Sequence, residues 1–378
     1  MVAAVVVGLT ACAKTGAQGD TDIHLAVVAD LTGLGHPVGV DGADGFSTAI
    51  AAMNERGGVA GRRVVVDRYD TQSEPNGAQV AFRTALAKRP AAIYYSGLSA
   101  TLHSVLPLLR SAKVPVVASS ATPEAVKEPW FFTAYAIPEG SANVLVDAAK
   151  QAVGGSLRGK NIAIVSNSGP GSAVQIPLME KAVAAGGGQV VVVEQTDTGI
   201  ASFASQAQKI VSRQPDAVLT LQAGDQVTVT KALVVAGMTG PIVGTIGGAS
   251  DTQIKVIEAS NYLGLRDALP PQPGDEIYTA AQKFGTTASA TSIYFTYGYA
   301  FAHVLAQVLP VCGGIECASD ELISAIRGAG PVTPPNYLAP LDFSNTQNGP
   351  TAEVLYRWDT ARGEVVAAGD PIAVAPRR

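Results

Sequence analysis

The chain has 378 residues, a length typical of roughly two ordinary domains, and 47% of them are apolar while 15% are charged. This composition excludes an intrinsically disordered chain and a coiled coil. The 26 basic and 31 acidic residues give a net charge of −5 and form no basic run, which argues against nucleic-acid binding.

Residues 1–22 have the pattern of a secretory signal followed by a polar linker. An apolar core from Met1 to Gly8 precedes the order Leu-Thr-Ala-Cys that ends at Cys12. This order resembles the lipobox of bacterial lipoproteins, which implies a diacylglyceryl anchor on Cys12 and attachment to the outer face of the cell membrane. No positive charge precedes the core, so we expect the true start to lie upstream of Met1. The alternative is an ordinary apolar N-terminal strand.

Cys312 and Cys317 are the other two cysteines. Thiols outside the cytoplasm are oxidised, and the turn at Gly313-Gly314 allows the two sulfurs to meet. We therefore expect a disulfide that closes a small loop between two helices. The alternative, a metal or redox pair, lacks a nearby histidine or third cysteine.

From residue 23 the sequence alternates short β-branched runs with longer amphipathic runs, a pattern that predicts strands alternating with helices. The strands predicted in the first half are residues 23–29, 63–69, 91–95 and 114–117. The helices predicted between them are residues 42–54, 75–87 and 100–112. Such a succession folds into a doubly wound parallel sheet.

The same alternation begins again at residue 161. The strands predicted here are residues 161–165, 189–194, 217–221 and 241–244, and the helices are residues 173–185, 202–213 and 225–236. Two helices (275–284 and 292–308) and a hairpin (354–366) follow. The predicted fold class is therefore α/β, with two Rossmann-like lobes that contain parallel sheets and join near Ala136–Pro138.

Catalytic and nucleotide-binding motifs are incomplete. The segment Gly154–Lys160 is followed by Asn161, where a P-loop needs a serine or threonine hydroxyl. In Gly169–Val174, Pro170 removes an amide that a pyrophosphate would use. No Gly-x-Ser-x-Gly elbow and no pair of histidines at ligand spacing exist. We expect neither enzymatic activity nor a cofactor nor a metal.

Small hydroxyl side chains follow two predicted strands of the first half, in Tyr95–Thr101 and Ala118–Pro123. Ligands of open α/β sheets bind at the carboxyl ends of the strands, where free amides and hydroxyls suit a carboxylate. We interpret the two loops as a ligand cradle. The alternative is that Ser99, Ser120 and Thr122 only cap helices.

Further segments share a pattern with one family; they are Val28–Gly33, Ala51–Gly61, Tyr69–Pro75, Ser119–Thr122 and Gly237–Gly244. With them the sequence resembles the type I periplasmic binding proteins of the branched-chain amino-acid class, the receptors of ABC importers. The resemblance implies two lobes joined by three crossovers, near residues 136–138, 261–272 and 341–348. It divides the chain into one lobe of 23–137 and about 270–343, and another of 138–269 and about 344–378.

The resemblance also assigns candidate ligand contacts. In the first lobe they are Ser99, Ala100, Ser120, Ala121, Thr122 and His36, the last in a glycine-rich loop. In the second lobe they are Asn167, Gln222, Asp225 and Ile246. The acid that pairs with a ligand ammonium in this family falls at Ile246, so Asp225 is the nearest substitute.

The sequence therefore predicts an extracytoplasmic, monomeric solute-binding protein of an ABC importer, with a membrane permease as partner. Burying an ammonium without a counter-charge is costly, so we expect a small carboxylated or polar ligand that lacks an ammonium group. The alternatives are a receptor for branched-chain or other amino acids, and a ligand sensor that signals to a membrane partner.

Overall fold

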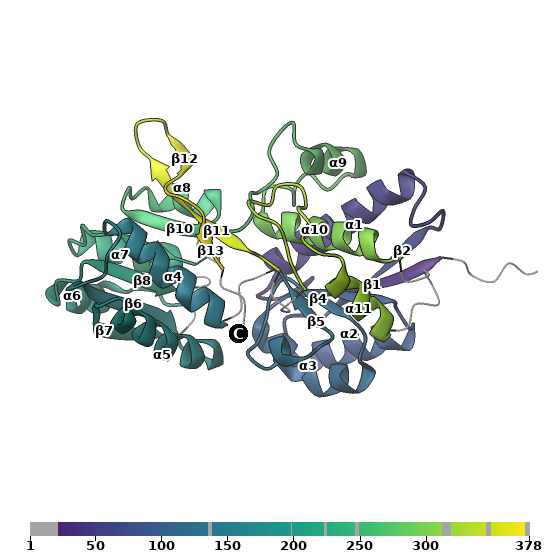
Figure 1. Ribbon diagram of the computed structural model, residues 1–378, viewed down its shortest axis with the longest axis horizontal. Helices are drawn as coiled ribbons and strands as arrows, with labels where there is room; N and C mark the ends of the chain where they lie inside the picture. The colour runs from purple at the N-terminus through teal and green to yellow at the C-terminus, as the bar shows by residue number, and fades with distance from the viewer. Residues whose placement is uncertain are drawn as a thin grey trace, which may run out of the picture.

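The computed structural model describes residues 22–134, 138–197, 199–222, 225–245, 249–311, 319–344 and 349–374. Two lobes lie side by side in it, each built on a sheet with helices on both faces (Figure 1). Cys12, Ile246, Cys312 and Cys317 fall outside the described residues. The lipid anchor, the disulfide and the contact at Ile246 therefore stay predictions.

The first lobe contains a five-stranded parallel sheet in the order β2-β1-β3-β4-β5. Its strands are β1 (Ile23–Ala29), β2 (Val64–Asp70), β3 (Ala92–Ser96), β4 (Val116–Ala118) and β5 (Phe131–Thr133). The helices that pack on it are α1 (His36–Glu55), α2 (Pro75–Ala87), α3 (Ser99–Ala112), α9 (Glu276–Phe284), α10 (Ile293–Val308) and α11 (Ser319–Gly328), with a 3-10 turn at Ala125–Lys127. Both faces of the sheet are buried. Leu25 and Val27 contact the α1 and α10 side, while Ala26 and Val28 contact α2 and α3.

The second lobe contains an eight-stranded sheet. Its strand order is β12-β11-β10-β9-β8-β6-β7, and β13 pairs with β11. Its strands are β6 (Asn161–Asn167), β7 (Gln189–Thr196), β8 (Ala217–Leu221), β9 (Ile242–Gly244), β10 (Tyr262–Arg266), β11 (Ala352–Asp359), β12 (Glu364–Ala367) and β13 (Ile372–Ala373). Its helices are α4 (Pro138–Ala152), α5 (Pro170–Ala185), α6 (Ala204–Ser212), α7 (Gln226–Val235) and α8 (Asp251–Ile257). Strands β6 to β10 are parallel to one another, whereas β11 runs antiparallel to β10.

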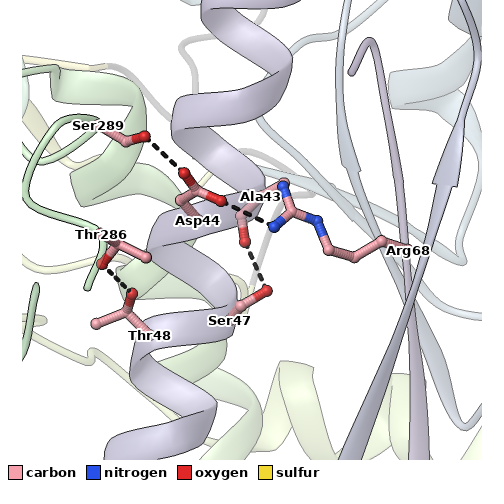
Figure 2. A network of polar contacts seen from close by, with 7 residues as sticks. All are labelled: Ala43, Asp44, Ser47, Thr48, Arg68, Thr286 and Ser289. Atoms are coloured by element: carbon pink, nitrogen blue, oxygen red, sulfur yellow. Dashed lines mark hydrogen bonds and ion pairs between the residues drawn. The ribbon is translucent and has the colours of Figure 1, made fainter. Parts of the chain in front are cut away.

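Helix α1 begins at His36, so the prediction of a glycine-rich loop up to residue 42 was wrong. The glycines serve close packing instead, because a Cβ at Gly45 would lie 2.0 Å from the carbonyl oxygen of Phe295 in α10. Polar contacts fix the same helix from its sides. Arg68 Nη1 lies 2.8 Å from Asp44 Oδ1, and the Ser289 hydroxyl donates to Asp44 Oδ2 at 2.6 Å (Figure 2).

The connections between the lobes meet at the carboxyl ends of the parallel strands. Strand β5 ends at Thr133 and leads toward α4, while β10 ends at Arg266 and leads back to the first lobe. The Gly349 amide, just before β11, donates to the Thr133 carbonyl oxygen at 2.8 Å. The carboxyl-terminal edge of each sheet therefore faces the junction. The crossover predicted over residues 261–272 was wrong in its first part, because 262–266 form β10 inside the second sheet.

Candidate ligand-binding site

The carboxyl-terminal edges of the two sheets bring most of the predicted site residues to the junction. Ser99 and Ser120 follow β3 and β4 of the first lobe. Asn167 ends β6, and Gln222 follows β8 of the second lobe. Because parallel sheets bind ligands at this edge, the arrangement suits a ligand held by both lobes.

Ser120 and Thr122 lie two residues apart and have different surroundings. The Thr122 hydroxyl accepts a hydrogen bond from the Ala125 amide at 3.1 Å, so this side chain caps the short turn that follows. The Ser120 hydroxyl oxygen is shielded from solvent and has no hydrogen-bond partner among the described residues. Ser120 is therefore the side chain of this loop that needs a partner.

The start of α3 has no side-chain cap within the described chain. Its N-cap residue is Leu98, and Ser99 and Ala100 are exposed residues of the first turn. Ser99 therefore does not act as the N-cap, which was the structural alternative for this residue. The first amides of a helix have no partner within the helix, so those of Ser99 and Ala100 can bind an acceptor from outside it.

Gln222 is the most unusual polar residue of the second lobe. It is 1% exposed, and neither its Nε2 nor its Oε1 has a hydrogen-bond partner in the described part of the chain. A buried amide without hydrogen bonds costs a few kcal/mol, roughly 1–3 on mutational evidence. Because native proteins rarely leave such a group unsatisfied, Gln222 is a strong candidate for a ligand contact.

Asp225 has partners within its own lobe. Its Oδ2 accepts hydrogen bonds from Asn167 Nδ2 at 3.2 Å and from the Gly199 amide at 2.9 Å. These contacts join the loops after β6, β7 and β8. The carboxylate therefore has a structural role in its own lobe. Both donors are uncharged, so the role of Asp225 as substitute for the missing ammonium partner stays a prediction.

Two residues at the same edges were not found by sequence reasoning. Thr196 ends β7, and its buried hydroxyl has no partner among the described residues. Asp30 follows β1 and is fully buried. A polar residue directly after a buried strand was the signal available for Asp30, whereas Thr196 is the last residue of a half-buried strand and had no such signal. His36 is exposed at the first position of α1, and Ala121 is half-buried.

Two α/β lobes whose carboxyl-terminal sheet edges face each other have the architecture of a bilobal binding protein. A sequence profile described as periplasmic binding protein matches residues 22–362. The chain therefore belongs to the periplasmic binding protein family and has the type I fold, as predicted. This family consists of solute-binding proteins of the ABC-transporter type that are not enzymes.

Solved structures with the same fold have low sequence identity. A branched-chain amino acid ABC transporter protein from Thermus thermophilus with bound valine is 16% identical, with a TM-score of 0.80 over 94% of this chain and 98% of that chain. A solute-binding protein from Rhodopseudomonas palustris HaA2 in complex with p-hydroxybenzoic acid is 18% identical, with the same TM-score and coverage. A fatty acid ABC transporter substrate-binding protein from Thermomonospora curvata is 19% identical, with a TM-score of 0.74 over 94% of this chain and 93% of that chain.

A comparison with curated protein sequences finds no match. Within the described part of the chain, no helix combines the length and apolar character needed to cross a membrane.

Proposed function

We propose that this periplasmic binding protein captures a small carboxylated or polar ligand without an ammonium group and delivers it to an ABC permease. The observation that carries the proposal is the buried carboxamide of Gln222, whose donor and acceptor are both unsatisfied in the described structure. A ligand that offers an acceptor and a donor, such as a hydroxyl, amide or carboxyl group, would satisfy both atoms.

The chemistry around Gln222 favours a group without positive charge. A carboxamide can hydrogen-bond to a cation but does not neutralise it. The position at which the family carries the acid that pairs with a ligand ammonium is Ile246 here, and burying an ammonium without a counter-charge is costly. In the first lobe, the Ser120 hydroxyl and the amides of Ser99 and Ala100 offer donors to a carboxylate.

Capture would proceed by hinge closure without any covalent step. One rigid lobe would comprise residues 23–137 and about 270–343. The other would comprise residues 138–269 and about 344–378. A ligand that contacts both lobes stabilises the closed state, which the permease then recognises. The proposal includes a monomer that is tethered outside the cytoplasm by a lipid on Cys12 and has a disulfide between Cys312 and Cys317.

Mass spectrometry of small molecules that co-purify with the protein, followed by calorimetry, tests the ligand class. The titration panel contains 4-hydroxybenzoate, octanoate, L-valine and L-isoleucine. We expect an organic acid to bind and both amino acids to bind at least about 100-fold more weakly, which corresponds to about 2.7 kcal/mol. Tight binding of valine or isoleucine would refute the ligand class and favour the amino-acid alternative. Ligand-dependent binding to a sensor kinase rather than to a permease would favour the sensor alternative.

A further inference from the structure

Asp30 joins the ends of three strands beneath the proposed site. It follows β1 and is 0% exposed. Its Oδ2 accepts a hydrogen bond from the Leu98 amide at 3.0 Å, and its Oδ1 accepts one from the Thr71 hydroxyl. Its own amide donates to the Ser96 carbonyl oxygen at 3.0 Å. One carboxylate therefore ties the loop after β3 to the loops after β1 and β2.

The backbone around Asp30 leaves no spare room. A Cβ on Gly35 would lie 2.1 Å from Asp30 Oδ2, and a Cβ on Gly97 would lie 2.4 Å from Oδ1. Gly35 is the N-cap of α1, and Gly97 directly precedes Leu98, the N-cap of α3. The carboxylate therefore lies against the starts of two helices, where backbone dipoles favour a negative charge.

Asp30 compensates for a missing cap at α3. The N-cap Leu98 supplies no side-chain hydrogen bond, and the first helical bond runs from the Leu102 amide to the Leu98 carbonyl oxygen at 3.1 Å. The contact from Asp30 to the Leu98 amide therefore fixes the residue from which the helix starts. The position of Leu98 in turn determines the orientation of the next two amides, those of Ser99 and Ala100.

Burial raises the pKa of Asp30, while the hydrogen bonds from Thr71 and Leu98 lower it, and burial dominates. The charge of this carboxylate is thus not essential to its hydrogen bonds, since a neutral carboxamide also offers an oxygen to the Leu98 amide. Position 30 therefore requires a side chain of this shape with an oxygen that accepts hydrogen bonds.

We propose that Asp30 is a positioning residue of the ligand site, which holds the Leu98 amide so that the start of α3 presents Ser99 and Ala100 to the ligand. This role rests on the proposed function. It also has a consequence that can be measured without any ligand, because the Asp30 clamp restrains the amides at the start of α3.

The test compares Asp30→Asn, which keeps an oxygen for the Leu98 amide, with Asp30→Leu, which keeps the approximate size but has no acceptor. Hydrogen exchange is followed at the amides of residues 98–102, and affinity is measured for 4-hydroxybenzoate, octanoate and L-valine. We expect Asp30→Leu to speed this exchange about tenfold or more and to weaken binding by a similar factor. Asp30→Asn should stay within about threefold of the wild type on both measures.

Asp70→Leu is the matched control. Asp70 Oδ1 accepts from the Leu31 amide at 3.0 Å and from the Gln72 amide at 2.8 Å, and within the described part of the chain it makes no hydrogen bond to the loop after β3. This variant should lower overall stability and leave exchange at residues 98–102 unchanged relative to the rest of the first lobe.

Three results would overturn the role of Asp30. They are unchanged exchange at residues 98–102 in Asp30→Leu, equal loss of affinity in Asp30→Asn and Asp30→Leu, and faster exchange without any loss of affinity for a probe that binds the wild type. Binding of L-valine in preference to both acids would refute the proposed ligand class, while the exchange measurement, which needs no ligand, still decides whether Asp30 acts as the clamp.

Discussion

Two buried glutamines four residues apart have opposite surroundings. Gln226 accepts from the Thr220 hydroxyl at 2.8 Å and donates to Thr230 Oγ1 at 2.9 Å. Gln222 has no such partner in the described structure. An unsatisfied buried amide destabilises a fold and a satisfied one does not. We therefore assign Gln226 a structural role and Gln222 a contact with the ligand.

We expect Gln222→Leu to leave the free energy of unfolding unchanged or to raise it by about 1 kcal/mol, since an unsatisfied group is removed. Ligand affinity should fall about tenfold or more. Gln226→Leu is the control and should lower stability by about 1–3 kcal/mol with little effect on affinity, because it leaves Thr220 and Thr230 unsatisfied. Denaturant unfolding and calorimetry measure both quantities. A large stability loss in Gln222→Leu would contradict the assignment.

The same contrast applies to Ser120 and Thr122. Ser120→Ala removes a hydroxyl that has no hydrogen-bond partner among the described residues, so stability should stay within about 0.5 kcal/mol of the wild type while ligand affinity falls. Thr122→Ala removes the cap on the Ala125 amide and should cost about 0.5–2 kcal/mol of stability. Thermal unfolding with and without the bound ligand distinguishes the two. Equal stability losses would mean that Ser120 has a structural role.

At the scale of elements, α1 and α10 form the tightest contact of the first lobe. Gly42 and Gly45 on α1 face Gly298 and Phe295 on α10, and a Cβ on Gly298 would lie 2.0 Å from the Gly42 carbonyl oxygen. On the side of α1 that faces the sheet, Phe46 stacks on Tyr94 of β3 with ring centroids 4.8 Å apart. Glycine in the middle of a helix is intrinsically unfavourable, so close packing is the reason these residues are tolerated here.

Gly45→Ala should therefore lower the free energy of unfolding by more than about 2 kcal/mol, because backbone atoms block the new methyl group. Gly171→Ala is the control, since a Cβ at Gly171 in α5 meets no atom within 4 Å. That substitution should be neutral or raise stability by up to about 1 kcal/mol through helix propensity. Urea unfolding of both variants tests the prediction, and a neutral Gly45→Ala would contradict the packing argument.

Most strands and helices were predicted to within one or two residues, because burial on both faces leaves continuous β-branched runs. Several elements were not assigned, namely β5 (131–133), α4 (138–152), α8 (251–257), β10 (262–266), α11 (319–328) and β13 (372–373). Strand β10 contains Gly264 and a fully buried Arg266, so its sequence is atypical of a central strand. It is a strand because β9 and β11 pair with it on either side.

At the scale of the whole molecule, two buried acids lie where the lobes join. Asp267 follows β10 and is 1% exposed, and Glu353 lies near the start of β11 and is 7% exposed. Burial raises the pKa of Asp267 to about 7, partly opposed by a hydrogen bond from the Tyr297 hydroxyl. Burial and the nearby Asp267 raise the pKa of Glu353 to about 8. Burial at the junction therefore favours the protonated forms of Asp267 and Glu353.

This arrangement predicts that stability falls as the pH rises. Both groups have pKa values near 4 when exposed, so between about pH 4 and 8 the folded chain binds more protons than the unfolded chain. Their stabilisation is complete below about pH 4 and is lost as the pH rises through 7 and 8. Asp267→Asn and Glu353→Gln, which imitate the protonated acids, should each reduce the fall in melting temperature between pH 5 and about pH 9.

Asp216→Asn is the control for this pH series. The Asn161 amide and Lys160 lower the pKa of Asp216, so its stabilisation is present at neutral pH and is lost on acidification. The variant should be less stable than the wild type at pH 7, yet show the same slope between pH 6 and about pH 9. An unchanged slope in both Asp267→Asn and Glu353→Gln would show that the junction does not favour the protonated acids.

Local pattern in the sequence determined the alternation of strands and helices, the two-lobed class and the loops in which a site could form, because periodicity and turn residues act over a few neighbours. Tertiary structure alone decided which polar side chains in those loops are satisfied. Asp225 accepts from Asn167 and Gly199, in the loops after β6 and β7, whereas Ser120 and Gln222 have no hydrogen-bond partner among the described residues. The reason is that such partners come from other strands and loops, whose positions no single stretch of sequence specifies. The cap that Thr122 makes to the Ala125 amide is local, and the sequence already offered it as an alternative.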